Sequence, residues 1–455
     1  MIRRLLIANR SEIAVRILRA CKEMGIESVV AYSQADADSL AVQLADDSIC
    51  IGPANAKDSY LNMHAILQAA CSAGCDAIHP GYGFLSENAK FARLVQECDL
   101  TFVGPSFGLI ELMGDKTQAR TRMKEVGVPV VDGCEDPLIT VQQALDLADS
   151  IGYPVIIKAR HGGGGRGMRI VWKAEELESA YIQARQEAKA CFDNDEVYME
   201  RYIQDPKHVE VQLLADHYGH VVHLYERDCS FQRKNQKMIE ESPCSILPEE
   251  TRQNLLNDAV KAARSIGYDS VGTMEFLLDK DGHYYFMEMN TRIQVEHPVT
   301  EAVTGIDLIK WQLKIAAGQK LTLKQEEIPC RGVAMECRIN AEDVAHDFAP
   351  SPGKITFMHL PGGHGIRVDT AVYCGSTISP YYDSMILKLI VQAPTRLECI
   401  KKMRAALEET IIDGVKTNVE FLYLTLYQKE FIEGIHNIGY ASILLERLKE
   451  NGQFI

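Results

Sequence analysis

The strongest constraint on the fold is the alternation of short apolar runs with amphipathic segments over the first hundred or so residues. Between the first two runs, Ser11–Met24 places its apolar side chains on one helical face and is followed by Gly25, which is typical of a helix. Strands that alternate with helices predict a mostly parallel sheet. The runs that we interpret as strands are Leu5–Ala8, Ser28–Tyr32, Ser48–Ile51, Ala77–His79 and Thr101–Val103.

The turn after the first predicted strand, residues 9–11, contains no glycine and therefore lacks the fingerprint of a dinucleotide-binding fold. Asn9 followed by Glu12 predicts a capping box at the start of the first helix. Two further capping boxes, Thr395 with Glu398 and Thr417 with Glu420, predict the starts of two helices that close the chain.

A glycine-rich segment, residues 161–168, lies between two predicted strands, Pro154–Lys158 and Arg169–Trp172. Its glycines match the dinucleotide-binding pattern, but that pattern requires a helix where this chain has a strand, so we reject this interpretation. A backbone without side chains can approach phosphate groups closely. The segment therefore predicts a mobile β-hairpin lid over a phosphate site, with a flexible surface hairpin as the alternative.

Composition limits the classes of partner. The formal net charge of −15 argues against nucleic acid or an anionic membrane surface as the main partner. The thirteen cysteines include no CxxC pair, which indicates a reducing compartment. No signal peptide or bilayer-spanning apolar run is recognisable, so we expect a cytoplasmic protein.

The segment from Glu288 to Glu301 carries the most chemistry. In an extended chain, alternate polar residues would share one side. Glu and Asn supply oxygen ligands for Mg²⁺, Arg and Gln can hold a small oxyanion, and one carboxylate remains for acid–base work. A straight segment would separate the first and last of these residues by roughly 26 Å, so one site requires a bend after about Asn290. The alternative is a solvated edge strand. The alternate polar residues of this segment are Glu288, Asn290, Arg292, Gln294 and Glu296.

Three more residues fit such a site. Glu275 lies within the apolar run Val271–Leu278, and a buried carboxylate there must be paired or bind a metal. An outward-facing Glu275 is the alternative. Lys116 and Lys158 could converge on a polyphosphate, or they could be surface lysines. The charged run 226–237 would usually be a solvated face, and Cys229 within it is interpreted as a structural thiol.

Together these segments resemble the biotin carboxylase family of ATP-grasp enzymes over essentially the whole chain. The resemblance implies an N-terminal α/β domain (1–114), a central ATP-grasp domain (115–330) with a glycine-rich lid (about 131–205), and a C-terminal α+β domain (331–446). The matching segments are 7–10, 79–88, 113–116, the glycine-rich loop, 226–237, 288–301 and 336–342.

The family implies roles for individual residues. Glu296 would remove the bicarbonate proton, Lys237 would stabilise charge on the transferred phosphoryl group, and Arg338 would stabilise the biotin enolate. Mg²⁺ or Mn²⁺ would be held by Glu275, Glu288 and Asn290. The bicarbonate and biotin pocket would comprise Tyr82, Gly83, Arg292, Gln294, Val295 and Arg338. The ATP contacts would be Lys116, Lys158, Gly163, Gly164, Gly165, Met168, Glu200, Ile203, His208, Gln232, Glu275 and Glu288.

The function expected from the resemblance is ATP- and bicarbonate-dependent carboxylation of biotin, as the first half-reaction of acetyl-CoA carboxylase in fatty acid synthesis. The expected partners are a biotin carboxyl carrier protein, carboxyltransferase subunits and a second copy of the chain. The alternatives are the equivalent subunit of another acyl-CoA carboxylase, a different ATP-grasp ligase, and a non-enzymatic nucleotide-binding module. Three positions depart from the common family pattern: Ser11, Arg160-His161 and Asn235.

Overall fold

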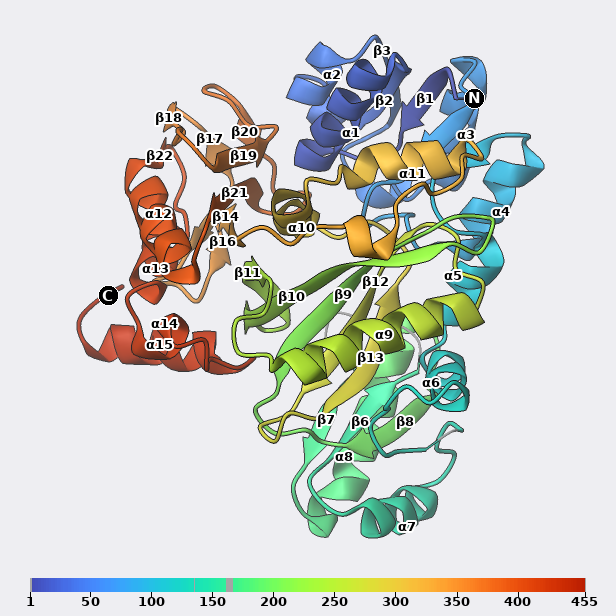
Figure 1. Cartoon of the computed structure of the whole chain (residues 1–455), viewed down its shortest axis with the longest axis vertical. Coiled ribbons are helices and arrows are strands. Elements are labelled where there is room, and N and C mark those ends of the chain that lie inside the picture. The colour runs from blue at the N-terminus through green and yellow to red at the C-terminus, as the bar shows by residue number, and fades with distance from the viewer. Residues whose placement is uncertain (1, 135, 161–166, 455) are drawn as a thin grey trace.

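The N-terminal part of the protein is a five-stranded parallel sheet in the order β3-β2-β1-β4-β5, as the alternating pattern predicts. The computed structural model describes residues 2–134, 136–160 and 167–454, and Figure 1 places this sheet near the N-terminus at the top of the molecule. Its strands and main helices are β1 (Arg4–Ile7), α1 (Ser11–Met24), β2 (Glu27–Ser33), α2 (Leu40–Leu44), β3 (Asp47–Gly52), α3 (Met63–Ser72), β4 (Ala77–His79), α4 (Ala89–Glu97) and β5 (Thr101–Phe102).

The capping box predicted for α1 is wrong. The residue at the cap is Arg10, and no side chain caps the helix. Asn9 instead donates through Nδ2 to the carbonyl oxygens of Pro80 (2.6 Å) and Tyr82 (2.7 Å), so it joins the loops after β1 and β4. Ser11 has a φ of 57°, a left-handed conformation that glycine adopts without strain. That backbone explains why glycine is the commoner residue there.

The largest element is an eight-stranded antiparallel sheet in the order β13-β12-β9-β10-β11-β14-β21-β19. Helix α9 (Glu249–Ser265) lies across its central strands (Figure 1) and packs on an apolar core that includes Leu256, Met274 and Phe286. The strands are β9 (Lys207–Ala215), β10 (Val221–Arg233), β11 (Gln236–Ser242), β12 (Val271–Leu278), β13 (Tyr284–Asn290), β14 (Val333–Asn340), β19 (Ile366–Thr370) and β21 (Met385–Ala393).

This sheet runs across the expected boundary at residues 330/331, because β11 pairs directly with β14. The residues before and after that boundary therefore share one hydrogen-bonded layer. The proposed domain limits describe successive parts of the chain, but the central and C-terminal parts are continuous at the level of the backbone.

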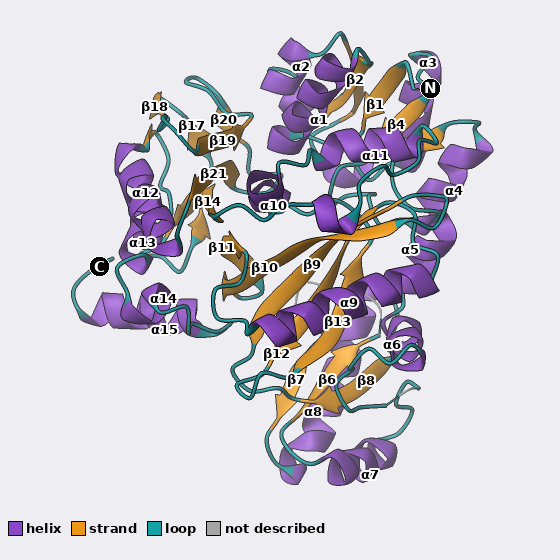
Figure 2. Ribbon diagram, in the orientation of Figure 1, coloured by secondary structure: helices purple, strands orange, loops and turns teal. Residues whose placement is uncertain are grey.

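A three-stranded sheet in the order β7-β6-β8 forms a separate layer at the bottom of Figure 2. Helices α7 (Val141–Ile151) and α8 (Ala174–Phe192) cover it. The antiparallel pairing of β6 (Val155–Ala159) with β7 (Arg169–Val171) confirms the predicted hairpin, and β8 (Val197–Arg201) pairs with the other edge of β6. The turn at 161–166 lies outside the described residues, and movement of this region as a lid stays a prediction.

The C-terminal end differs from the expected pair of helices. The described chain contains α12 (Arg396–Glu409), α13 (Val419–Thr425), α14 (Lys429–Ile432) and α15 (Tyr440–Glu450). The capping box of Thr395 with Glu398 is confirmed. The one predicted at Thr417 is wrong, because Asn418 occupies the cap and its side chain bonds to the backbone of Arg338 and Asn340 instead. Within the described residues, no helix is both long and apolar enough to cross a membrane.

Candidate active site

A cavity of about 700 Å³ lies where the parallel sheet, the eight-stranded sheet and the three-stranded sheet meet. The loops after β1 and β4 reach it because the order of the parallel sheet reverses between these strands, which opens a crevice at their carboxyl ends. The predicted site residues that line the cavity are Tyr82, Gly83, Lys116, Lys158, Met168, His208, Gln232, Lys237, Glu275, Glu288, Asn290, Arg292, Gln294, Val295, Glu296 and Arg338.

Glu200 and Ile203, predicted to contact the nucleotide, are buried but are not among the residues that line the cavity. The Glu200 carboxylate accepts from Lys158 (2.5 Å) and pairs with Arg120. Burial opposes ionisation of Glu200, but Lys158 and Arg120 lower its pKa. Glu200 therefore fixes Lys158 at the cavity wall. The three glycines at 163–165 lie outside the described residues.

The predicted bend after Asn290 is present. Strand β13 ends at Asn290, and helix α10 (His297–Thr304) begins directly after Glu296. Between these elements the chain turns back toward the sheet. Arg292 donates to the side-chain oxygens of Gln294 (3.0 Å) and Asn290 (3.1 Å) and to Glu87 (2.9 Å). The alternating polar residues, which would be spread along a straight strand, thus surround one space.

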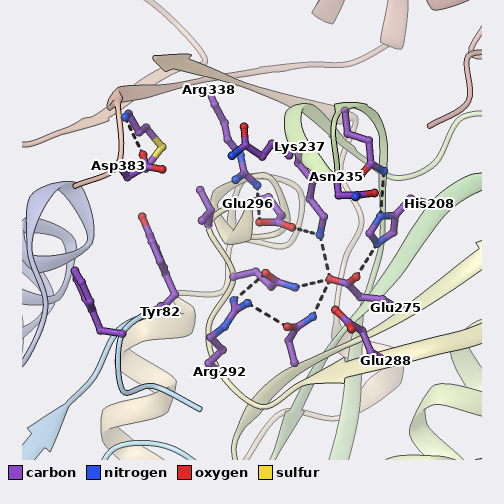
Figure 3. Close-up of a pocket in the computed structure, with 18 of the residues that line it drawn as sticks. Tyr82, His208, Asn235, Lys237, Glu275, Glu288, Arg292, Glu296, Arg338 and Asp383 are labelled. Carbon is purple, nitrogen blue, oxygen red and sulfur yellow. Dashed lines mark hydrogen bonds and ion pairs between the residues drawn. The ribbon is translucent and has the colours of Figure 1, made fainter. Parts of the chain in front are cut away.

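Lys237, on β11, is the central cation of the cavity. Its Nζ lies 3.1 Å from Glu275 and 2.6 Å from Glu296 (Figure 3). It also lies 2.6 Å from Glu210. Burial alone would favour the neutral amine, but the three carboxylates raise the pKa of Lys237 well above its usual value. The ammonium is therefore charged and is held rigidly by three acceptors, which makes it a preorganised site for negative charge.

Glu296 lies between two cations, as Figure 3 shows. Its Oε1 accepts from Lys237, and its Oε2 accepts from Arg338 at 3.0 Å. Burial opposes ionisation, yet Lys237, Arg338 and Arg227 hold the pKa of Glu296 well below its usual value. Arg338 also donates through Nε to Glu240 at 2.6 Å. Burial raises the pKa of Glu240 to about 7 even though Arg338 opposes the shift. Of the two carboxyl groups that Arg338 contacts, Glu296 therefore has the lower pKa.

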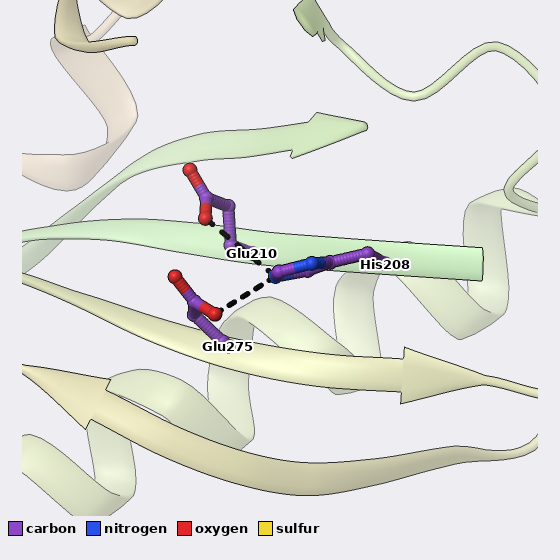
Figure 4. Close-up of side chains that lie close together, drawn as sticks. All are labelled: His208, Glu210 and Glu275. Atoms are coloured by element: carbon purple, nitrogen blue, oxygen red, sulfur yellow. Dashed lines mark ion pairs between the residues drawn. The ribbon is translucent and has the colours of Figure 1, made fainter. Parts of the chain in front are cut away.

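The donor set fits a hard divalent cation. Glu275 and Glu288 are direct partners on β12 and β13, so their side chains lie on one face of the sheet, and both offer the oxygen ligands that Mg²⁺ prefers. Asn290 donates to Glu275 at 2.8 Å. His208, Glu210 and Glu275 form a second group whose ligand atoms lie within 4.8 Å of one another (Figure 4). The predicted set of Glu275, Glu288 and Asn290 stays a prediction.

Sequence reasoning missed several charged residues. A charged run such as 226–237 would usually be a solvated face, but Arg227 is fully buried and donates to Glu210 at 2.5 Å and to Gln212 at 2.6 Å. The sequence signal for this buried cluster was the alternation of His208, Glu210 and Gln212 on one face of β9.

Asn235, which departs from the family pattern, lines the cavity from the turn between β10 and β11. Cys229 is buried, and burial raises its thiol pKa well above the usual value, as a structural thiol requires.

Comparison with known proteins gives one family over nearly the whole chain. Family models match residues 1–110 (biotin carboxylase, N-terminal domain), 115–324 (carbamoyl-phosphate synthase L chain, ATP binding domain) and 336–442 (biotin carboxylase C-terminal domain). Biotin carboxylase 1 of Bacillus subtilis is 54% identical over 438 residues, which cover 96% of this chain and 97% of that protein.

Solved structures of the same family resemble this chain over nearly its whole length. The crystal structure of a biotin carboxylase-beta-gamma-ATP complex from Campylobacter jejuni superposes with a TM-score of 0.95 at 48% identity and covers 97% of this chain and 99% of that one. The biotin carboxylase domain dimer of the 2-oxoglutarate carboxylase from Hydrogenobacter thermophilus, in complex with MgADP, ADP and bicarbonate, gives a TM-score of 0.94 at 49% identity. That match covers 99% of this chain and 98% of the other.

Proposed function

This chain belongs to the biotin carboxylase family of ATP-grasp enzymes, and on that premise we propose that it carboxylates biotin on a carrier protein as the first half-reaction of acetyl-CoA carboxylase. The enzyme is an ATP-dependent ligase that uses ATP and Mg²⁺, with biotin as substrate. The proposed part is the assignment to acetyl-CoA carboxylase, the carrier and carboxyltransferase partners, a homodimeric state, the domain limits and the role of each site residue.

In the proposed reaction, Glu296 accepts the bicarbonate proton while a bicarbonate oxygen attacks the γ-phosphorus of ATP, and the bond to the ADP oxygen breaks. Lys237 stabilises the charge on the phosphoryl oxygens. The carboxyphosphate product splits into CO₂ and phosphate, and the phosphate takes the proton from the ureido nitrogen of biotin. Arg338 stabilises the enolate that results, and the nitrogen then attacks CO₂. Glu275, Glu288 and Asn290 would hold Mg²⁺, which would supply positive charge to neutralise the phosphate oxygens.

The observation that carries this proposal is the position of Glu296 between two cations. Lys237 connects it to the carboxylates of the proposed metal site, and Arg338 connects it to the side of the cavity lined by Tyr82. A base that takes part in both phosphoryl transfer and biotin carboxylation needs one contact toward the proposed metal site and one toward the proposed biotin site. An ATP-grasp ligase for another small acid would share the lysines and metal ligands, but it would have no use for Arg338 at this point.

The test measures ADP formation by the purified protein with MgATP, bicarbonate and free biotin. We expect ADP formation that requires bicarbonate and increases with biotin. ADP formation that ignores biotin would contradict the assignment of Tyr82 and Arg338. The acceptor is tested separately, by isolating the native complex through its biotinylated polypeptide and offering acetyl-CoA or 2-oxoglutarate. Carboxylation of acetyl-CoA supports the proposal, and exclusive carboxylation of 2-oxoglutarate overturns the assignment to acetyl-CoA carboxylase.

A further inference from the structure

Lys388 is a fully buried lysine for which the reaction described above has no role. It lies in the middle of β21, and its side chain has 0% exposure. Its Nζ lies 3.0 Å from Oε1 of Glu12 and donates to the carbonyl oxygen of Val295 at 2.8 Å. A buried ammonium needs compensation, and here it comes from two parts of the chain that are far apart in sequence.

The two acceptors of Lys388 lead directly to the cavity. Val295 belongs to the segment between β13 and α10, next to Glu296. Glu12, on α1, also accepts a hydrogen bond from the hydroxyl of Tyr82, which also lines the cavity. Lys388 therefore connects the backbone of the proposed bicarbonate pocket with the side chain proposed to face the biotin ring.

A third connection comes from strand pairing. Lys388 is the direct partner of Arg338 across β14 and β21, and of Asp369 across β19 and β21, so these side chains share one face of the sheet. Burial lowers the pKa of Lys388, but Glu12, Glu336 and Asp369 outweigh burial and raise it. The ammonium is charged beside Arg338, which turns toward Glu240 and Glu296 instead.

We propose that Lys388 is a positioning residue that holds the Val295 carbonyl and, through Glu12, the Tyr82 hydroxyl in register with Arg338. This inference rests on the proposed roles of Val295 and Tyr82 in binding bicarbonate and biotin. Lys388 touches no reacting atom. Its effect is to join helix α1, the segment after β13 and the C-terminal strands at one buried point, so that the two small substrates meet at a fixed separation.

The test compares Lys388→Met with a matched variant, Lys207→Met. Lys207 is also buried, and it also contacts one carboxylate, Asp228 (2.8 Å), and one carbonyl oxygen, that of His436 (2.9 Å). We expect Lys388→Met to raise the KM for bicarbonate and for biotin about 10-fold to 100-fold, because small misplacements of reacting groups have large effects. Lys207→Met should leave both KM values within about twofold of the wild type. Equal effects of the two variants would overturn the proposal.

The double variant Glu12→Gln/Lys388→Met separates positioning from charge compensation and serves also if the single variant fails to fold. It removes the carboxylate that the single variant leaves uncompensated, and the amide oxygen introduced at position 12 can still accept from Tyr82. We expect thermal stability to recover while the KM for bicarbonate stays high, since the Val295 carbonyl still lacks its donor. Recovery of both the thermal stability and the KM for bicarbonate would show that Lys388 only balances the charge of Glu12, and would overturn the proposal. A wild-type enzyme whose ADP formation ignores biotin would instead overturn the proposed function.

Discussion

Replacing Lys237 by methionine tests the electrostatic account of the cavity. The change removes the ammonium that contacts Glu210, Glu275 and Glu296 at 2.6–3.1 Å. Removing one member of a buried ion pair typically costs about 3–5 kcal/mol of unfolding free energy. Lys237 has three carboxylate partners, but the loss of unfolding free energy should not be three times as large, because each carboxylate keeps another partner. Glu210 keeps Arg227, Glu275 keeps His208, and Glu296 keeps Arg338.

For a cooperative unit of about 200 residues, 1 kcal/mol corresponds to about 2–4 °C in Tm, so we expect Lys237→Met to lower Tm by roughly 6–20 °C at pH 7. The matched control is Lys234→Met, in the turn that precedes β11. Lys234 is 68% exposed and pairs with an exposed carboxylate, Asp347. Such surface pairs contribute about 0–1 kcal/mol, so the control should lower Tm by at most about 4 °C.

The pH dependence follows from the directions of the pKa shifts. Glu275 and Glu296 have folded pKa values below their usual value of 4.5. Their stabilisation is therefore present above about pH 4.5 and is lost as the pH falls through the folded values. Lys237 has a folded pKa above 10.5, so its contribution is present below about pH 10.5 and is lost at higher pH. The Tm difference between wild type and Lys237→Met should be largest between about pH 5 and 10 and should shrink in acid.

The assay is thermal unfolding followed by differential scanning fluorimetry from pH 3 to 9, together with ADP formation at pH 7. We expect the bicarbonate-dependent rate of Lys237→Met to fall about 10²-fold to 10³-fold, the loss typical of a removed oxyanion donor. A Tm equal to that of the Lys234→Met control at pH 7, or a Tm difference that stays constant into acid, would refute the reasoning about the three carboxylates.

Three further predictions concern neighbouring groups. Glu296→Gln removes the proposed base, so bicarbonate-dependent ADP formation should fall at least about 10²-fold, while MgADP affinity by isothermal titration calorimetry stays near that of the wild type. Glu288→Gln removes a proposed metal ligand and should raise the Mg²⁺ concentration for half-maximal rate at least about 10-fold, as a Mg²⁺ titration of the rate would measure. Arg227→Met leaves Glu210 with Lys237 at 2.6 Å and His208 at 3.9 Å, and chemical denaturation should show a loss of about 3–5 kcal/mol of unfolding free energy. An active Glu296→Gln enzyme, an unchanged Mg²⁺ requirement, or a stable Arg227→Met protein would contradict the respective assignments.

Local patterns were sufficient to predict much of the fold. The apolar spacing of Ser11–Met24 predicts the bounds of α1, and the run Val271–Leu278 coincides with β12. Capping was less predictable where a polar side chain had a more distant use. Asn9 joins two loops, and Asn418 bonds to strand β14, so neither takes part in a capping box. Such competition between local and distant partners cannot be read from sequence spacing alone.

The candidate site shows the same limit. The residues on the segment after β13 could be identified together because they alternate along a few residues of chain. Glu210 and Glu240 could not, because each contributes through a contact with a cation on a different strand, Lys237 and Arg338 respectively. Charges that neutralise one another across a sheet look like solvated residues in a linear sequence, and only the pairing of the strands reveals that they are buried.

The direct pairing of β11 with β14 has a consequence for engineering this chain. A cut at residue 331 would expose the main-chain donors and acceptors of Glu240 and its neighbours along a buried edge, and such an unprotected edge invites association with other copies. The truncated protein should precipitate or form oligomers even though its remaining parts are intact. Chimaeras that exchange the C-terminal segment between relatives should therefore carry β11 and β14 together from one parent.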